Sequence, residues 1–90
     1  MILTAPAAIA ASVVHAAAMS TNATLAAARS DLHRAAAADD GHRRTQYALS
    51  ARDNASSVLM EPASSLLERE YAGLYFAQAH AIVESDEQSG

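Results

Sequence analysis

The stretch that decides the fold is residues 35–45, AAAADDGHRRT, where a long alanine-rich segment meets two aspartates and a glycine. Asp and Gly disfavour a helix interior, and Gly readily adopts the left-handed conformation that ends many helices. We therefore predict a turn at residues 39–42, with Gly41 as a left-handed cap and Thr45 as the N-cap of the next helix. The alternative is a continuous helix, because each aspartate lies four residues before an arginine.

Residues 6–38, which precede this turn, contain no glycine, and their single proline is Pro6, at the position where proline suits a helix start. Apolar residues recur at helical spacing on one face. A polar stripe lies on the opposing face and keeps its phase across the weak helix formers at positions 20–22. We predict one unbroken helix over residues 6–38, about 50 Å long. The predicted buried face contains Ile9, Val13, Ala16, Ala17, Ser20, Thr24 and Ala27, extended by Val14, Leu25, Ala28 and Leu32. The polar stripe contains His15, Asn22, Arg29 and His33.

The sequence after the turn predicts two further helices, over about 45–60 and 62–84, followed by a polar, frayed tail at 85–90. The residue before Pro62 is pushed out of the α region, which ends the middle helix. The last helix begins either at Pro62 or at Ser65, where S-x-x-E forms a capping box. The predicted fold class is therefore all-α, with two long helices and a shorter middle one. They form a hairpin or a three-helix arrangement in one small domain over residues 1–90.

The core that this chain can build is thin. Hydrophobic residues make up 51% of the 90 positions, but 24 of them are Ala, which leaves 22 larger apolar side chains. Their burial barely offsets the conformational entropy lost on folding. We therefore expect the chain to need a partner, and to bind it through the last helix, whose apolar arc is too wide for one contact. The predicted interface residues are Leu67, Tyr71, Leu74, Tyr75, Phe76, Ile82 and Val83. Among them Phe76 is the expected anchor, whereas Arg69 lies on the polar sector.

Composition and charge exclude several classes of protein. Without Cys the chain has no disulfide, no zinc finger of the usual type and no thiol nucleophile. A net charge of −4 lacks the basic field that attracts nucleic acid. The amino-terminal stretch MILTAPAAIAASVVHAAAM has no Lys or Arg before its apolar run and is mostly Ala. We expect a helix outside the membrane there, rather than a signal peptide or a membrane span.

The histidines do not predict a metal site. His15 and His33 lie about 27 Å apart on one helix, and His80 with Glu84 at i+4 reads as a surface pair. His33 and His42 flank the turn without the carboxylate pattern of a di-iron bundle. Serine, histidine and aspartate are present without a nucleophile elbow. The sequence therefore predicts no catalytic residue, no metal and no cofactor.

Two clusters have a binding alternative. Arg43 and Arg44 beside His42 could hold a phosphate or an acidic surface, but their i,i+4 spacing favours charge compensation of the aspartates at 39 and 40. Tyr71, Tyr75 and Phe76 could stack on a ligand ring, but aromatic residues at helical spacing usually belong to a core or an interface.

The chain length, the alanine content, the opening Thr4-Ala5-Pro6 and the polar mid-chain turn resemble the small helical-hairpin substrates of type VII secretion, the PE and W-x-G families. The resemblance implies pairing with a second hairpin into a four-helix bundle. The defining motifs differ: position 7 is Ala rather than Glu, only Gly41 of W-x-G is present, and neither Tyr71 nor Tyr75 has an acid four residues on. No functional residue is transferred from these families.

These observations predict a small, non-enzymatic structural or accessory subunit that binds other proteins, or itself, through apolar helix faces. One alternative is a secreted helical-hairpin partner protein. A second is a small ligand-binding or enzymatic helical domain. Nothing in the sequence indicates a compartment.

Overall fold

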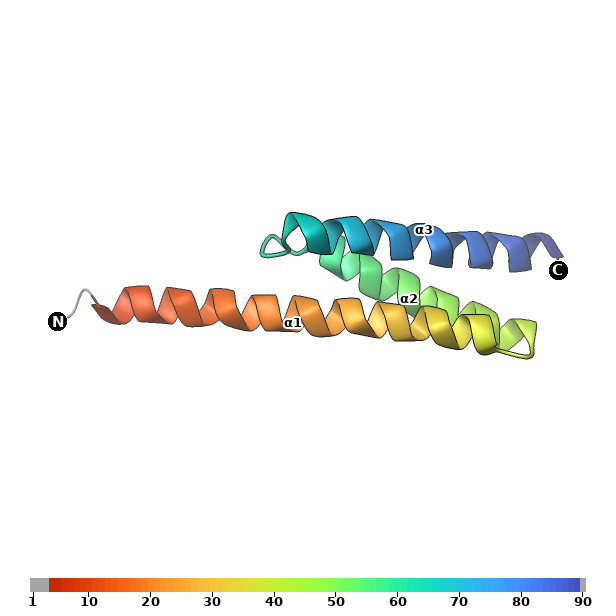
Figure 1. Cartoon of the computed structure of the whole chain (residues 1–90), viewed down its shortest axis with the longest axis horizontal. Coiled ribbons are helices and arrows are strands. Elements are labelled where there is room, and N and C mark those ends of the chain that lie inside the picture. Colours follow the sequence, from red (N-terminus) through yellow and green to blue (C-terminus); the bar gives the residue numbers. More distant parts are fainter. Residues whose placement is uncertain (1–3, 90) are drawn as a thin grey trace.

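The computed structural model describes the backbone of residues 4–89 and the side chains of residues 20–88. It contains three helices, α1 (Thr4–Ala37), α2 (Gly41–Met60) and α3 (Leu66–Ser89) (Figure 1). No strand occurs between residues 4 and 89. The all-α prediction is confirmed, and the chain adopts the three-helix arrangement rather than a two-helix hairpin.

Helix α1 passes through residues 20–22 without a break, as its polar stripe predicted. Its predicted face is confirmed in part, because Ala28 is buried. Ser20 and Ala27 of that face are exposed, however, and Thr21 and Ala35, which lie outside it, are buried. Alanine occurs on every face of this helix, so neighbouring faces differ little in hydropathy. The predicted positions before residue 20 lie outside the described side chains.

The turn between α1 and α2 lies where the sequence placed it, but its capping differs. Gly41 does not have a positive φ and is instead the first residue of α2. Asp40 is the N-cap: its backbone is extended, and its Oδ1 accepts a hydrogen bond from the Arg43 backbone N–H at 2.8 Å. Both the left-handed Gly41 cap and the Thr45 N-cap are therefore wrong. An aspartate carboxylate satisfies a free N–H and favours the positive end of the helix dipole, so α2 begins four residues earlier than predicted.

Helix α3 starts with the predicted capping box. The Ser65 backbone N–H donates to Glu68 Oε1 at 2.8 Å, and the Glu68 backbone N–H donates to Ser65 Oγ at 3.1 Å. The predicted frayed tail is wrong, because the helix continues to Ser89. Asp86 accepts a hydrogen bond from Thr45 Oγ1 at 2.5 Å, which holds this last part of α3 against α2.

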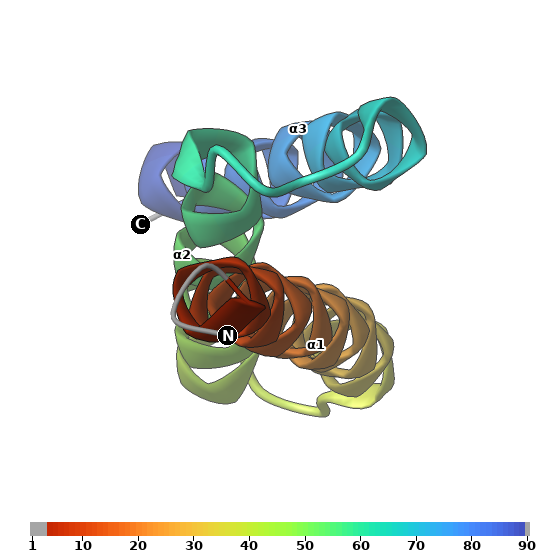
Figure 2. The same ribbon diagram turned by 90° about the vertical axis from the view of Figure 1, so that its left-hand side faces the viewer.

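Helix α2 lies between α1 and α3 and packs against both (Figure 2). Among residues 20–88, the buried hydrophobic residues are seven alanines and two valines: Ala28, Ala35, Ala48, Ala51, Ala55, Val58, Ala72, Ala79 and Val83. All three helices meet around Ala28, Val58 and Ala72, and Leu25, Tyr75 and Phe76 cover the edge of this cluster. The buried residues of α2 are Ala48, Ala51, Ala55 and Val58.

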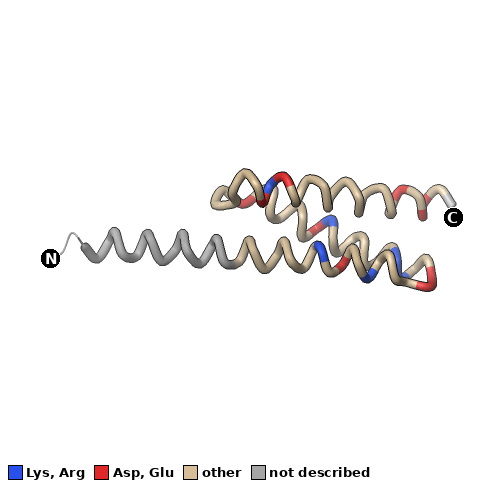
Figure 3. Tube along the Cα trace, viewed as in Figure 1, with Lys and Arg blue, Asp and Glu red and all other residues tan. Residues whose placement is uncertain are grey.

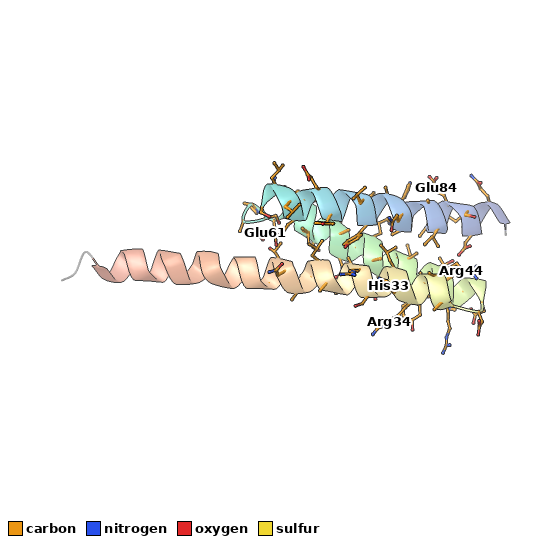
Figure 4. The ribbon with its side chains drawn as sticks, viewed as in Figure 1. His33, Arg34, Arg44, Glu61 and Glu84 are labelled. Atoms are coloured by element: carbon orange, nitrogen blue, oxygen red, sulfur yellow. The ribbon has the colours of Figure 1, made fainter. Side chains whose placement is uncertain are left out.

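Polar contacts connect the helices beside this small core. The Asp31 carboxylate on α1 is only 8% exposed. It accepts hydrogen bonds from Ser50 Oγ at 2.6 Å and Asn54 Nδ2 at 3.1 Å, both on α2. At the end of the bundle that contains the α1–α2 turn, the Arg44 guanidinium donates to the Ala38 carbonyl at 3.2 Å and lies 3.9 Å from Asp86 (Figure 4). Arg44 thus links α2 to α3 and to the residue that follows α1.

The position of Gly41 predicts that Gly41→Ala stabilises the chain. A Cβ at this residue meets nothing within 4 Å, and the backbone does not need a positive φ. Alanine reduces the entropy of the unfolded chain, so we expect a gain of about 0.4–1 kcal/mol in the free energy of unfolding. Urea unfolding measures it. Gly73→Ala in α3, where a Cβ is equally free, is the matched control and should also stabilise. A lower stability for Gly41→Ala alone would contradict the capping by Asp40.

The capping box predicts that Ser65→Ala lowers the free energy of unfolding by about 1 kcal/mol, because a free N–H in the first turn of α3 loses its acceptor. Ser57→Ala is the control. Its hydroxyl donates to the Asp53 carbonyl on an exposed face of α2, where alanine is the better helix former. In thermal melts followed by circular dichroism, Ser65→Ala should lower the melting temperature and Ser57→Ala should raise it. Equal melting temperatures would contradict the role of the box.

Candidate interaction surface

The outer face of α3 carries a row of large apolar side chains that no part of the described chain covers. Leu67, Tyr71 and Leu74 are 59%, 45% and 58% exposed. Their spacing of three and four residues places them on one face of the helix, which we call the α3 stripe. No Asp, Glu, Lys or Arg lies between Glu70 and Glu84 in the middle of α3 (Figure 3).

A groove of about 730 Å³ runs between α1 and α3, beside this stripe. Its lining residues are Asn22, Leu25, Ala26, Arg29, Ser30 and His33 from α1 and Tyr71 and Tyr75 from α3. The two tyrosine rings are 6.2 Å apart and tilted by 32°. The α1–α3 groove therefore has one polar wall and one aromatic wall, and Tyr71 belongs to both the groove and the α3 stripe.

The α1 wall of the groove is basic in a chain whose net charge is −4. Arg29 and His33 lie on it, and none of the described lining residues is acidic. Among the side chains that the structure describes, Arg29 has no hydrogen bond or ion pair. Figure 4 places His33 where α1 runs alongside the other helices. The sequence predicted these residues as a polar stripe opposite the buried face. The structure shows that Asn22, Arg29 and His33 of this polar stripe border α3, and His15 lies outside the described side chains.

The structure divides the predicted interface residues into two groups. Leu67, Tyr71 and Leu74 are exposed, and Tyr75 and Ile82 are half-buried. Phe76 packs against the core cluster and Val83 is buried, so both serve the packing of the chain itself. The wide apolar arc of α3 thus consists of an inner face that packs within the chain and an outer face that is exposed. Periodicity alone does not separate these two faces.

Arg69, which the sequence assigned to the polar sector of the last helix, also has a structural role. Its Nη2 donates to the backbone carbonyls of Glu61 at 3.1 Å and Pro62 at 3.4 Å (Figure 4 labels Glu61). These bonds connect α3 to the loop that precedes it. A substitution of Arg69 therefore affects the loop as well as the surface.

His80 joins α2 to α3 through a short polar chain. Arg52 Nη1 lies 3.2 Å from His80 Nδ1, and His80 Nε2 lies 3.0 Å from Glu84 Oε1. A guanidinium only donates, so Nδ1 accepts and the imidazole proton is on Nε2, from which it is donated to Glu84. The ring also stacks on Phe76 with centroids 5.9 Å apart. The prediction of a His80–Glu84 surface pair is confirmed.

The basic cluster at the turn does not show the charge compensation that the sequence favoured. Arg44 pairs with Asp86 on α3, and the Asp40 carboxylate caps the backbone N–H of Arg43. The expected charge compensation between residues four apart is therefore wrong. The described side chains contain no group of three potential metal ligands.

Comparison with protein-family models, curated proteins and solved structures gives no significant match. The resemblance to type VII secretion substrates therefore gains no support from a family model. Within the described residues, no helix combines the length and the apolar character needed to cross a membrane.

The division of the apolar arc predicts different effects for two substitutions on α3. Phe76→Ala removes a ring that covers the core cluster and should lower the free energy of unfolding by about 2 kcal/mol or more. Leu66→Ala removes a side chain that is 75% exposed and should change it by no more than about 0.5 kcal/mol. Urea unfolding at one protein concentration compares them. If Phe76→Ala were as stable as Leu66→Ala, Phe76 would not belong to the fold.

Proposed function

We propose that this protein is a small, non-enzymatic helical subunit that binds a protein surface through the α3 stripe and the adjoining α1–α3 groove. The observation that carries the proposal is the exposure of Leu67, Tyr71 and Leu74 on a helix whose other face is already buried. Exposed apolar residues in a continuous row mark interaction sites more often than isolated ones do.

The composition of the core supports this proposal. The nine hydrophobic residues that are buried among the described side chains are alanines and valines, which bury little apolar area each. The larger leucines of α3 remain outside, where a partner would cover them. Burial of these side chains on binding would add to the stability that the folded chain obtains from its own core.

The shape of the surface favours binding a macromolecule. The groove is open along two helices and is continuous with the stripe through Tyr71. Small-molecule sites usually enclose most of the ligand surface, whereas a helix lies in a groove with apolar residues at every third or fourth position. Tyrosine and arginine, both present here, are also enriched among residues that dominate binding energy.

The test compares two double variants of the full chain. Each is expressed at the natural level in the cells from which the protein comes. Leu67→Ser with Leu74→Ser removes the α3 stripe. Met60→Ser with Leu66→Ser is the matched control, because it removes two more strongly exposed apolar side chains that lie outside the stripe. Size-exclusion chromatography with light scattering gives the mass of the species that contains each chain.

We expect the wild-type and control chains in a complex heavier than 9.4 kDa, and the stripe variant as a 9.4 kDa monomer with unchanged helicity. A wild-type chain isolated as a monomer would contradict the proposed function. So would a stripe variant that stays in the complex.

A further inference from the structure

We propose that the α1–α3 groove binds an amphipathic helix of a different protein, and that this helix carries two carboxylates four residues apart. The inference rests on the proposed function and names the chemistry of the partner. The charge of the α1 wall, the spacing of its two basic side chains and the positions of this chain's own acidic residues lead to it.

The α1 wall of the groove offers hydrogen-bond donors that the described part of the chain does not use. Arg29 and His33 are exposed and line the groove, and neither has a hydrogen bond or ion pair among the described side chains. A guanidinium only donates, and an imidazole carries an N–H in either tautomer, so both side chains suit a carboxylate. None of the described lining residues is acidic, so a partner must supply that carboxylate.

The spacing of these donors matches a helix. The lining residues of α1 run from Asn22 to His33, which is about three turns, or ~16 Å, of one helix face. Arg29 and His33 lie four residues, ~6 Å, apart along the axis. Two carboxylates at positions i and i+4 of a partner helix have the same spacing. A helix that lies along α1 can therefore present one carboxylate to each of the two side chains.

The other wall of the groove defines the rest of the partner's surface. Tyr71 and Tyr75 form it, and Leu67 and Leu74 of the α3 stripe lie beside it. A helix between the two walls turns its apolar face toward α3 and the edge of that face toward α1. Exposed ion pairs contribute little to affinity, so the apolar contacts would supply the affinity and the carboxylates would select the partner.

A second copy of this chain does not offer such a helix. Its ten acidic residues are at positions 31, 39, 40, 53, 61, 68, 70, 84, 86 and 87, and no two of them are four residues apart. Glu84 and Glu87 are three apart, but Glu84 already lies 3.0 Å from His80 Nε2. The carboxylate pair that fits Arg29 and His33 therefore belongs to a different protein.

The experiment uses the purified full chain and a synthetic helical peptide of about 18 residues, or five turns. The peptide has leucine at every third or fourth position and two Glu residues, four apart, at the edge of the leucine face. In a matched peptide both Glu residues are Lys. Fluorescence anisotropy measures the two dissociation constants at about 0.15 M salt, which screens the long-range field of the chain. We expect the Glu peptide to bind about fivefold more tightly or better.

The net charge of the chain makes this comparison stringent. At −4 it favours the Lys peptide, so a preference for the Glu peptide reports the groove itself. Arg29→Glu should reverse the preference, because the charge on the α1 wall changes sign. Arg43→Glu is the matched control: it makes the same change in the first turn of α2, outside the groove lining, and should keep the wild-type preference.

A third variant separates the apolar contacts from the charged ones. Leu74→Ser removes a side chain of the α3 stripe without changing the charge, so it should weaken both peptides about fivefold or more and leave their ratio unchanged. Backbone amide NMR shifts locate the bound peptide. They should change at Asn22, Arg29 and Tyr75 and remain unchanged at Asp53 on the exposed face of α2. Circular dichroism confirms that every variant retains its helices.

Three results would overturn the inference. If the wild-type chain bound neither peptide, or bound both equally, the groove would not recognise a carboxylate pair. If Arg29→Glu kept the preference for the Glu peptide, the peptide would lie elsewhere. If the purified chain formed a dimer that the Glu peptide dissociates, the occupant would be a second copy. A complex in cells that depends on Leu67 and Leu74 would still support the proposed function in each case, because that test involves neither Arg29 nor the peptides.

Discussion

Close contact between helices across alanine is the constraint on which the rest of this structure depends. Ala48, Ala51 and Ala55 form the inner side of α2, so both neighbouring helices can pack directly against its backbone. Such packing buries little apolar area per residue, since each missing methylene forgoes about 0.8 kcal/mol. The fold therefore relies more than usual on its helix caps and on the polar contacts between helices, of which the Arg44 contacts and the Asp31 hydrogen bonds are the main examples.

The same constraint explains why large side chains remain outside. Helix α3 contributes Ala72, Ala79 and Val83 to the interior, and these small residues fit the narrow space beside α2. A leucine at their positions would force the helices apart. The leucines of α3 consequently lie on its outer side, beside the groove between α1 and α3. The small size of the buried residues therefore explains both the thin core and the large apolar side chains at the candidate interaction surface.

Local signals predicted the three helices, the continuity of α1, the position of the first turn and the capping box at Ser65. They did not distinguish an Asp40 N-cap from a Gly41 C-cap, because both end a helix at the same place. They also missed the burial of Asp31, whose donors lie 19 and 23 residues further along the chain. The groove depends on α1 and α3 being neighbours. Periodicity within one helix describes its faces and does not identify what each face meets.

The hydrogen bonds of Asp31 have a consequence for how α1 and α2 are aligned. Alanine surfaces are smooth and nearly repetitive, so one helix could slide past the other by a turn with little change in apolar contact. A slide of that size would leave the Asp31 carboxylate, which is almost fully enclosed, without Ser50 and Asn54. Arg34, on the same helix, would still lie 3.8 Å from the carboxylate, but the two hydrogen bonds to this enclosed group would be lost, which costs stability. The hydrogen bonds of Asp31 therefore favour one alignment of α1 and α2 among several that the alanines alone would leave nearly equal in energy.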